Sequence, residues 1–264
     1  MKTLRRLLPA ALCVALLAGT LTSCDWPEGT RYVHQVFTDV DVTSGIVYRT
    51  TTTHTGQPIE LKLDIYQPRG DTAAERPAVM WMFGGGWRSG DRTQLASYAQ
   101  DAAERGYVGV AIDYRIRPGP GFDLIGAALD AYDDTIAAIQ WLQAHAGDYR
   151  IDPDAVVAAG YSAGAVNALN AIFMPGTRGP ATSPAAAAVA IAGLSLAAAS
   201  ADRPAAIMFH GTADDIVPFA SGQAICDQSR AAGNVCTFVP YESGTHFIAF
   251  QQAADIQART ADFI

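Results

Sequence analysis

The sequence lacks the features of several protein classes. The body of the chain has no run of basic residues, no internal repeat and no linker rich in Ser, Gly or Pro. The formal net charge is −8, so we do not expect a nucleic-acid partner. Half of the residues are hydrophobic and 17% are charged, which excludes a disordered chain. Apart from its first residues, the chain of 264 residues is long enough for one large domain with a substantial core.

Residues 1–23 have the pattern of an export signal that is removed. A basic start is followed by an apolar stretch, Leu7 to Leu21, that is too short and too interrupted for a lasting membrane span. The segment ends in Leu21-Thr22-Ser23-Cys24, which resembles a bacterial lipobox. We therefore expect cleavage before Cys24 and lipid attachment to its thiol. A simple secretory signal with an accidental cysteine is the alternative.

On the lipoprotein interpretation, residues 24–30 tether residues 31–264 to a bacterial membrane, on its periplasmic or cell-surface side. Removal of the three basic residues of the signal takes the net charge from −8 to about −11. This charge argues against electrostatic docking to anionic lipid. We therefore expect membrane contact only through the N-terminal lipid anchor.

Cysteine is scarce, and its positions predict one disulfide. Cys13 leaves with the signal, so Cys226 and Cys236 remain beside the lipidated Cys24. An exported chain can oxidise this pair, and a loop of about ten residues would add roughly 2–3 kcal/mol of stability. The alternatives are two buried free thiols or, with less support, a metal site. No histidine lies near them in sequence.

Hydrophobic patterns predict an α/β fold. Three early β-branched, alternating segments predict an antiparallel meander: Val33 to Asp39, Ile46 to Thr53 and Ile59 to Tyr66. Apolar runs and helical patterns then alternate. The expected strands are Ala78 to Phe83, Tyr107 to Ile112, Ala155 to Gly160, Ala186 to Ala192, Ala206 to Phe209 and Val235 to Val239. The clearest expected helices are Thr93 to Arg105, Ala127 to Ala146 and Ala165 to Ile172. This order predicts a mostly parallel central sheet with helices on both faces.

The most informative stretch is Gly160-Tyr161-Ser162-Ala163-Gly164, between an expected strand and an expected helix. A serine between two glycines at such a turn is typical of a nucleophile elbow. The glycines remove side chains that would clash, and the Ser162 hydroxyl then stands above the sheet. A free serine is a poor nucleophile, so this one requires a base and an oxyanion site.

Chain order selects the base. A triad with this elbow runs in the order serine, acid, histidine. Three of the five histidines, His34, His54 and His145, precede the serine and are interpreted as surface or structural residues. His246, after the last expected strand, would take the proton from Ser162 and return it to the leaving group.

The acid is expected in the segment that follows the strand Ala206 to Phe209. Asp214 is the favoured residue to orient the imidazole, and Asp215 is the alternative. His210 precedes both acids, so we expect it to shape this turn rather than to act as a base.

The loop after the strand Ala78 to Phe83 is the expected source of oxyanion donors. It reads Gly84-Gly85-Gly86-Trp87, and its glycines let the backbone approach a ligand closely. The N–H of Ala163, directly after the serine, is expected to supply another donor. A phosphate-binding loop is the alternative, but the Lys-Ser/Thr ending of a P-loop is missing.

The chain resembles the α/β-hydrolase esterase/lipase family whose members carry a His-Gly-Gly-Gly-Trp oxyanion loop, close to bacterial feruloyl- and acetylxylan-esterase-like enzymes. The resemblance rests on Leu61 to Tyr66, Gly84 to Asp91, Asp113-Tyr114-Arg115, Ile151 to Gly164 and His210 to Pro218. By position it implies that Ser162, Asp214 and His246 are the triad. Gly85, Gly86 and Ala163 match the oxyanion donors. The implied reaction is two-step acyl transfer without a metal or organic cofactor.

Two residues depart from the family pattern. Phe83 replaces the histidine that braces the glycine loop in the family, so loop geometry or rate would differ. Ala165 replaces a glycine after the elbow, a small change that should be tolerated.

The resulting expectation is an exported serine carboxylesterase for short-chain acyl or aryl esters. The short segment from Phe173 to Ala186 leaves no room for a large lid, which suits a small-molecule or carbohydrate-attached ester. Trp87, Tyr161, Phe122 and Phe247 are candidates to line an aromatic-tolerant cleft. A peptidase or amidase of the same fold and a non-catalytic surface lipoprotein are the alternatives.

Overall fold

The computed structural model describes residues 30–264. The expected signal in residues 1–23, the lipidated Cys24 and nearly all of the tether lie outside these residues. Within them, no helix has the length and apolar character needed to cross a membrane.

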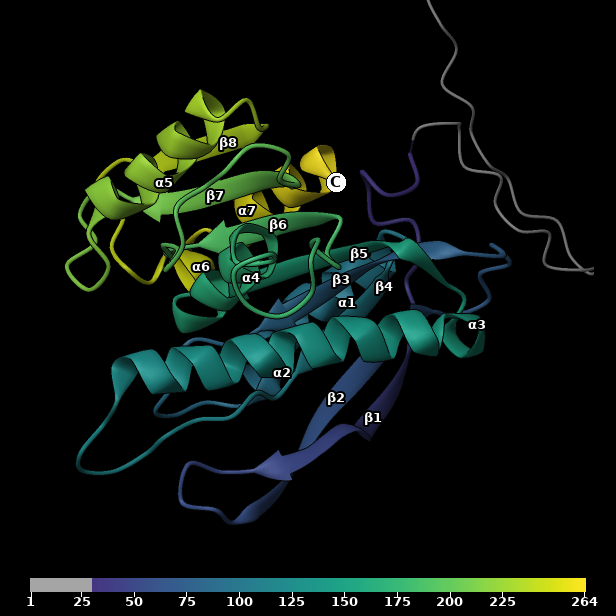
Figure 1. The fold of residues 1–264 in the computed structure, drawn as a ribbon. Helices are drawn as coiled ribbons and strands as arrows, with labels where there is room; N and C mark the ends of the chain where they lie inside the picture. The colour runs from purple at the N-terminus through teal and green to yellow at the C-terminus, as the bar shows by residue number, and fades with distance from the viewer. Residues whose placement is uncertain (1–29) are drawn as a thin grey trace, which may run out of the picture.

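Eight strands form one sheet in the order β1-β2-β4-β3-β5-β6-β7-β8 (Figure 1). Strand β2 runs antiparallel to both β1 and β4, and all later neighbours are parallel. The strands are β1 (Val40–Thr52), β2 (Pro58–Pro68), β3 (Arg76–Met82), β4 (Val108–Ile112), β5 (Ile151–Tyr161), β6 (Ala187–Ile191), β7 (Ala205–Gly211) and β8 (Cys236–Tyr241). The expected mostly parallel α/β sheet is confirmed.

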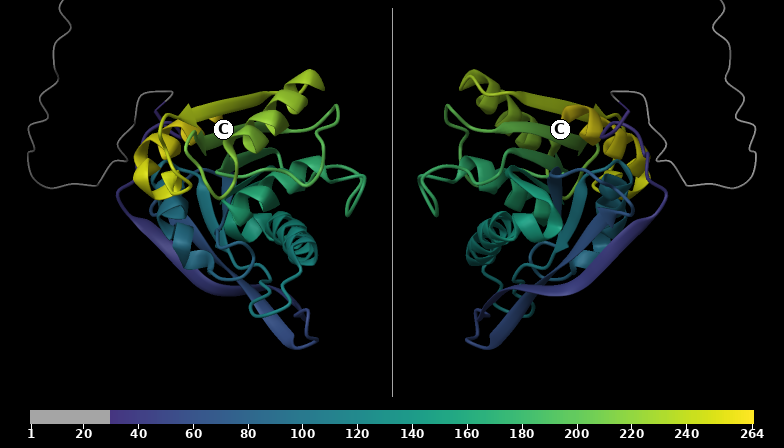
Figure 2. Two further views of the ribbon diagram at one scale, coloured as in Figure 1. Left: turned by 90° about the vertical axis from the view of Figure 1, so that its left-hand side faces the viewer. Right: turned by 90° about the vertical axis from the view of Figure 1, so that its right-hand side faces the viewer.

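Helices cover both faces of the sheet, as the two side views of Figure 2 show. Core residues of α2, α4 and α5 pack on one face, and those of α1, α6 and α7 pack on the other. The helices are α1 (Ala96–Glu104), α2 (Leu124–Ala144), α3 (Ala146–Tyr149), α4 (Ala163–Phe173), α5 (Phe219–Ala231), α6 (Ile248–Gln251) and α7 (Ala253–Phe263). This two-sided cover explains why the central strands read as continuous apolar runs.

Helix α4 lies deepest among the helices. Every residue from Ala163 to Phe173 is buried, because α4 is packed between the sheet and α2. Its alanines and glycine keep the helix narrow enough for this position. A helix that is buried all round needs little polarity on any face, and α4 carries only two buried amides, Asn167 and Asn170.

The expected first strand, Val33 to Asp39, is wrong. The segment contains turns, and the N–H groups of Val36 and Phe37 both donate to the carbonyl of Glu104 at the end of α1. The backbone of this segment is therefore hydrogen-bonded to the end of α1 instead of to a neighbouring strand. The first strand is β1, which begins at Val40, and β1 and β2 form an antiparallel pair.

The expected disulfide between Cys226 and Cys236 is present. It joins α5 to the first residue of β8, with ten residues of sequence separation. Residues 174–186, between α4 and β6, contain no helix or strand.

Candidate active site

Ser162 stands on a strained turn between β5 and α4. Its φ of 54° and ψ of −118° are unfavourable for a residue with a side chain. A Cβ added to Gly160 would lie 2.4 Å from the backbone of Gly164. A Cβ added to Gly164 would lie 2.0 Å from the carbonyl oxygen of Met82. Both glycines are therefore required by the close packing of the turn against itself and against β3.

The structure brings Ser162, His246 and Asp214 together at the carboxyl edge of the sheet. The Ser162 hydroxyl donates to Nε2 of His246 at 2.9 Å, and Nδ1 of His246 donates to Oδ2 of Asp214 at 2.9 Å. Ser162 is 9% exposed and His246 is 3% exposed, so the pair is largely dehydrated but still reachable. The residues come from the ends of β5, β7 and β8 and meet because these ends share one edge.

Asp214 is held as a carboxylate. Burial favours its neutral form, but hydrogen bonds from His246 and from the N–H groups of Val217 and Ile216 outweigh this effect. The pKa of Asp214 is therefore lowered from its ordinary value. Its side chain is fully buried, whereas the alternative acid Asp215 is exposed and makes no contact with His246.

His210 supports this acid. Its Nε2–H lies 2.9 Å from the carbonyl of Val217 and 3.2 Å from Oδ2 of Asp214. Burial lowers the pKa of His210, so the ring is neutral. It thus bridges the start and end of the turn that carries Asp214. Of the earlier histidines, His34 and His54 are exposed, and His145 stacks on Trp141.

The glycine loop presents backbone donors beside the serine. A Cβ on Gly84 would lie 3.2 Å from Cβ of Ser162, which places the loop in contact with the elbow. Gly85 and Gly86 have φ values of 120° and 61°. Their N–H groups and that of Ala163 have no hydrogen-bond acceptor within residues 30–264. Because the loop meets the elbow at Gly84, these unpaired donors lie on two segments that adjoin Ser162, an arrangement suited to a developing oxyanion.

Other side chains brace the loop where Phe83 replaces the family histidine. The Phe83 ring stacks on Tyr114 at 4.1 Å, and the Tyr114 hydroxyl donates to the Phe83 carbonyl at 2.7 Å. The Gly84 N–H donates to Oε1 of Gln94 at 2.6 Å. The indole N–H of Trp87 donates to Oδ1 of Asn167 in α4 at 3.0 Å. Several contacts within this chain therefore hold the glycine loop in place.

Sequence reasoning did not find Gln94 or Asn167. Tyr114 lies in the Asp113-Tyr114-Arg115 stretch that carries the family resemblance, so its motif was a usable signal. No local pattern distinguishes Gln94 from other surface glutamines. The second departure, Ala165, is accommodated because the facing residue is Gly193, where an added Cβ would lie 2.5 Å from that of Ala165.

The four aromatic residues expected to line a cleft differ in their exposure. Trp87 is 7% exposed and packs in the core, so it supports the loop from within. Tyr161 is also buried, with its ring 5.2 Å from that of His246, and Phe122 is half-buried. Phe247 is 52% exposed and lies edge-on to His246 at 5.9 Å. Phe247 is thus the candidate whose ring is open to an incoming substrate.

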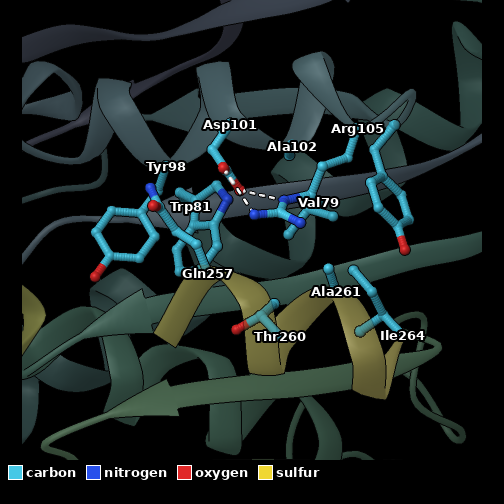
Figure 3. A pocket seen from close by; sticks show the side chains of 11 residues that line it. Val79, Trp81, Tyr98, Asp101, Ala102, Arg105, Gln257, Thr260, Ala261 and Ile264 are labelled. Carbon is cyan, nitrogen blue, oxygen red and sulfur yellow. Dashed lines mark hydrogen bonds and ion pairs between the residues drawn. The ribbon is translucent and has the colours of Figure 1, made fainter. Parts of the chain in front are cut away.

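A small pocket lies elsewhere, on the face covered by α1 and α7 (Figure 3). Trp81, Tyr98, Gln257 and Thr260 contribute to its lining, and none of the triad residues does. Its volume of about 10 Å³ is of the order of one water molecule. Within residues 30–264, no group of three or more His, Cys, Asp or Glu side chains could hold a metal ion.

This chain is similar to known esterases in sequence and in fold. Residues 63–176 match the family model BD-FAE. Esterase 2 of Thermogutta terrifontis phosphorylated by paraoxon is 28% identical, with a TM-score of 0.71 over 88% of this chain and 95% of that one. Its butyrate-bound structure is 27% identical, also with a TM-score of 0.71, over 89% and 95%.

Two curated relatives match shorter segments. Human carboxylesterase 5A is 31% identical over 45% of this chain and 21% of its own length. A probable isoprenylcysteine alpha-carbonyl methylesterase of Arabidopsis thaliana is 32% identical over 39% of this chain and 20% of its own length. This chain thus covers about a fifth of the length of each of these two relatives.

Proposed function

We propose that this chain, which belongs to the α/β-hydrolase carboxylesterase family, is an exported serine esterase for short-chain acyl or aryl esters. The observation that carries the proposal is the chain of contacts from Ser162 through His246 to Asp214, with 2.9 Å at each link. This geometry supports nucleophilic catalysis by Ser162, with His246 as general base and Asp214 as the group that orients it.

The reaction has two steps. In the first, Nε2 of His246 accepts the Ser162 proton while Oγ bonds to the ester carbonyl carbon. The N–H groups of Gly85, Gly86 and Ala163 stabilise the negative charge on the carbonyl oxygen. His246 then protonates the leaving alcohol, and an acyl-enzyme remains. In the second step, water loses a proton to Nε2 of His246 and attacks the acyl carbon. When the bond from this carbon to Oγ breaks, His246 returns the proton to Oγ, and the acid and free Ser162 are released.

The short-chain assignment is supported by the site's surroundings. Residues 174–186 contain no helix or strand, which favours an open site over one enclosed by a helical lid. Phe247 offers an exposed ring beside the base. Esterase 2 of Thermogutta terrifontis has been solved with propionate and with butyrate bound. We infer that the present chain also accepts short acyl groups, with a small-molecule or carbohydrate-attached ester as the substrate.

Export and anchoring are supported by the sequence at residues 1–24 and by the disulfide. An exported chain oxidises its cysteines, whereas reducing compartments keep thiols free. Cys226 and Cys236 are paired, which fits an extracytoplasmic location. The protein would then be a bacterial lipoprotein attached through Cys24, without a nucleic-acid partner.

Hydrolysis of p-nitrophenyl acetate, butyrate and octanoate by wild type and by Ser162→Ala tests the activity. We expect turnover that falls with acyl length and drops by about 10⁴-fold or more in the variant. Ser44→Ala, an exposed position on β1, is the matched control and should retain full activity. Anilides of the same acids separate an esterase from an amidase. A folded wild type that cleaves none of these compounds would contradict the proposal.

A further inference from the structure

A second polar cluster lies at the opposite edge of the sheet, where the parallel strands begin. Arg31, Arg76 and Arg150 surround the single carboxylate of Asp71. Arg31 binds Asp71 through two hydrogen bonds of 2.8 and 2.7 Å. Nε of Arg76 lies 3.6 Å from the same carboxylate. Arg150 donates to the backbone carbonyl of Asp71 at 2.9 Å.

The cluster has more positive charge than its carboxylate can balance. Both oxygens of Asp71 are used by Arg31, and one of them also accepts the Ala73 N–H. Arg76 is only 2% exposed, yet its buried Nε has no hydrogen-bond partner. Within residues 30–264, no other carboxylate forms an ion pair with the three arginines. Burying a charge without good partners costs free energy. An anion bound beside Arg76 would therefore stabilise the cluster.

The environment of Arg76 is consistent with this imbalance. Burial lowers the pKa of Arg76, and the charges of Arg150 and Arg31 lower it further, against the opposing effect of Asp71. An added anion would relieve both the burial cost and the repulsion between the arginines. Guanidinium groups match the oxygens of a phosphate in paired hydrogen bonds, which makes phosphate the best fit.

We propose that Arg31, Arg76 and Arg150 form a binding site for a phosphate group. Arg150 is exposed and supplies the open side, while buried Arg76 supplies the fixed charge. The net charge of −8 repels anions from the protein as a whole. Binding therefore depends on this local cluster and does not extend to general adhesion to anionic surfaces. The site is independent of the proposed ester hydrolysis.

Its place in the fold favours a lipid headgroup as the source of the phosphate. The first described residues lie at the end of the sheet opposite the arrowheads of β6 and β7 (Figure 1). Arg31 is seven positions after Cys24, a distance of at most about 25 Å for an extended chain. A headgroup held there would turn the amino edge toward the bilayer and leave Ser162 open on the far side. This contact would add to the lipid anchor, which the net charge alone predicts to be the sole membrane contact. A soluble phosphorylated compound is the other source of the same chemistry.

Thermal unfolding tests the site itself. The protein is the full chain with Cys24→Ser, which cannot be lipidated, in inorganic phosphate or in chloride of equal ionic strength. Phosphate should raise the Tm beyond chloride, because a ligand of the native state alone stabilises it. Arg150→Gln should weaken the apparent phosphate affinity about tenfold, as expected for one lost charge-assisted contact.

Arg88→Gln is the matched control, because it removes an exposed charge from the glycine loop without breaking a hydrogen bond or ion pair of the described chain. Its phosphate response should equal that of wild type. Equal stabilisation by phosphate and chloride would overturn the proposal, as would equal weakening by both substitutions.

Sedimentation with vesicles distinguishes the two sources. The Cys24→Ser chain should co-sediment with phosphatidylglycerol vesicles more than with phosphatidylcholine vesicles, and Arg150→Gln should reduce this difference. A phosphate-specific rise in Tm without vesicle binding would support the site, reject the lipid source and assign it to a soluble phosphate compound.

Discussion

The two edges of the sheet differ in how completely their buried polar side chains are paired. At the carboxyl edge, Ser162, His246 and Asp214 are linked to each other, and backbone N–H groups complete the set around the acid. At the amino edge, Arg76 is buried beside a carboxylate that Arg31 already occupies. In the first arrangement these three side chains are paired without any ligand, which suits their proposed catalytic role. The second leaves charge uncompensated and therefore responds to an anion from outside.

The carboxyl edge should be most sensitive at Asp214. Asp214→Asn keeps the shape but cannot hold Nδ1 of His246 protonated and Nε2 free, so kcat should fall about 10⁴-fold. Ester hydrolysis at saturating p-nitrophenyl butyrate measures this effect. Asp215→Asn is the control and should change kcat less than about twofold, because Asp215 is exposed and does not contact His246. A larger fall in kcat for Asp215→Asn than for Asp214→Asn would assign the acid to Asp215.

The pH dependence of stability follows from the same carboxylate. Because the folded-state pKa of Asp214 is lowered, its contribution to stability is fully present above the ordinary value of 3.8. It is lost as the pH falls below 3.8 through the folded-state pKa. Urea unfolding of wild type and Asp214→Asn should show their stability difference shrinking in this range. A difference that stays constant would mean that Asp214 titrates alike in the folded and unfolded chains.

The next largest fall in kcat is expected from a substitution that disturbs the glycine loop. Gln94→Ala leaves the buried N–H of Gly84 without its acceptor and loosens the donors at Gly85 and Gly86. We expect kcat to fall up to about 100-fold with little change in KM, because the donors act mainly on the transition state. Gln94→Glu retains an acceptor oxygen and should recover most of the rate.

Gln100→Ala, on the exposed side of α1, is the matched control for this substitution. A rise in KM at constant kcat would show instead that Gln94 supports substrate binding alone.

Local patterns predicted which three side chains meet at the carboxyl edge. The glycines of the elbow and the order of Ser162, Asp214 and His246 are readable because strand ends and chain order fix their positions. Contacts between distant segments were not readable. Val33 to Asp39 alternates like a strand, but its backbone is hydrogen-bonded to the end of α1. Gln94 and Asn167 become braces only when packing brings them to the loop.

The cluster of arginines at the amino edge could not be predicted from the sequence either. Its members, Arg31, Asp71, Arg76 and Arg150, are spread over about half of the chain. Each residue reads as an ordinary surface charge in its own segment. Only the folded sheet shows that one carboxylate is shared.

The disulfide between Cys226 and Cys236 also lies at the amino edge, because Cys236 is the first residue of β8. Replacing both cysteines by Ala should lower the free energy of unfolding by about 2–3 kcal/mol through a freer unfolded chain. Activity at 25 °C should persist, because the bond does not contact the triad. Urea unfolding measures the loss, and wild type in dithiothreitol should reproduce it. Unchanged stability after complete reduction would contradict this account.

The smallest expected effect concerns Arg76. In phosphate-free buffer, Arg76→Met should change the free energy of unfolding by less than about 1 kcal/mol or raise it, because an apolar chain replaces a poorly paired buried charge. Asp71 keeps its two hydrogen bonds from Arg31. Arg105→Met is the contrasting variant, because Arg105 has a well-formed pair with Asp101 at 2.8 Å, and its loss should destabilise the fold. Urea unfolding of both variants decides between these cases. A larger loss for Arg76→Met than for Arg105→Met would mean that Arg76 is already compensated, and the amino edge would then resemble the carboxyl edge.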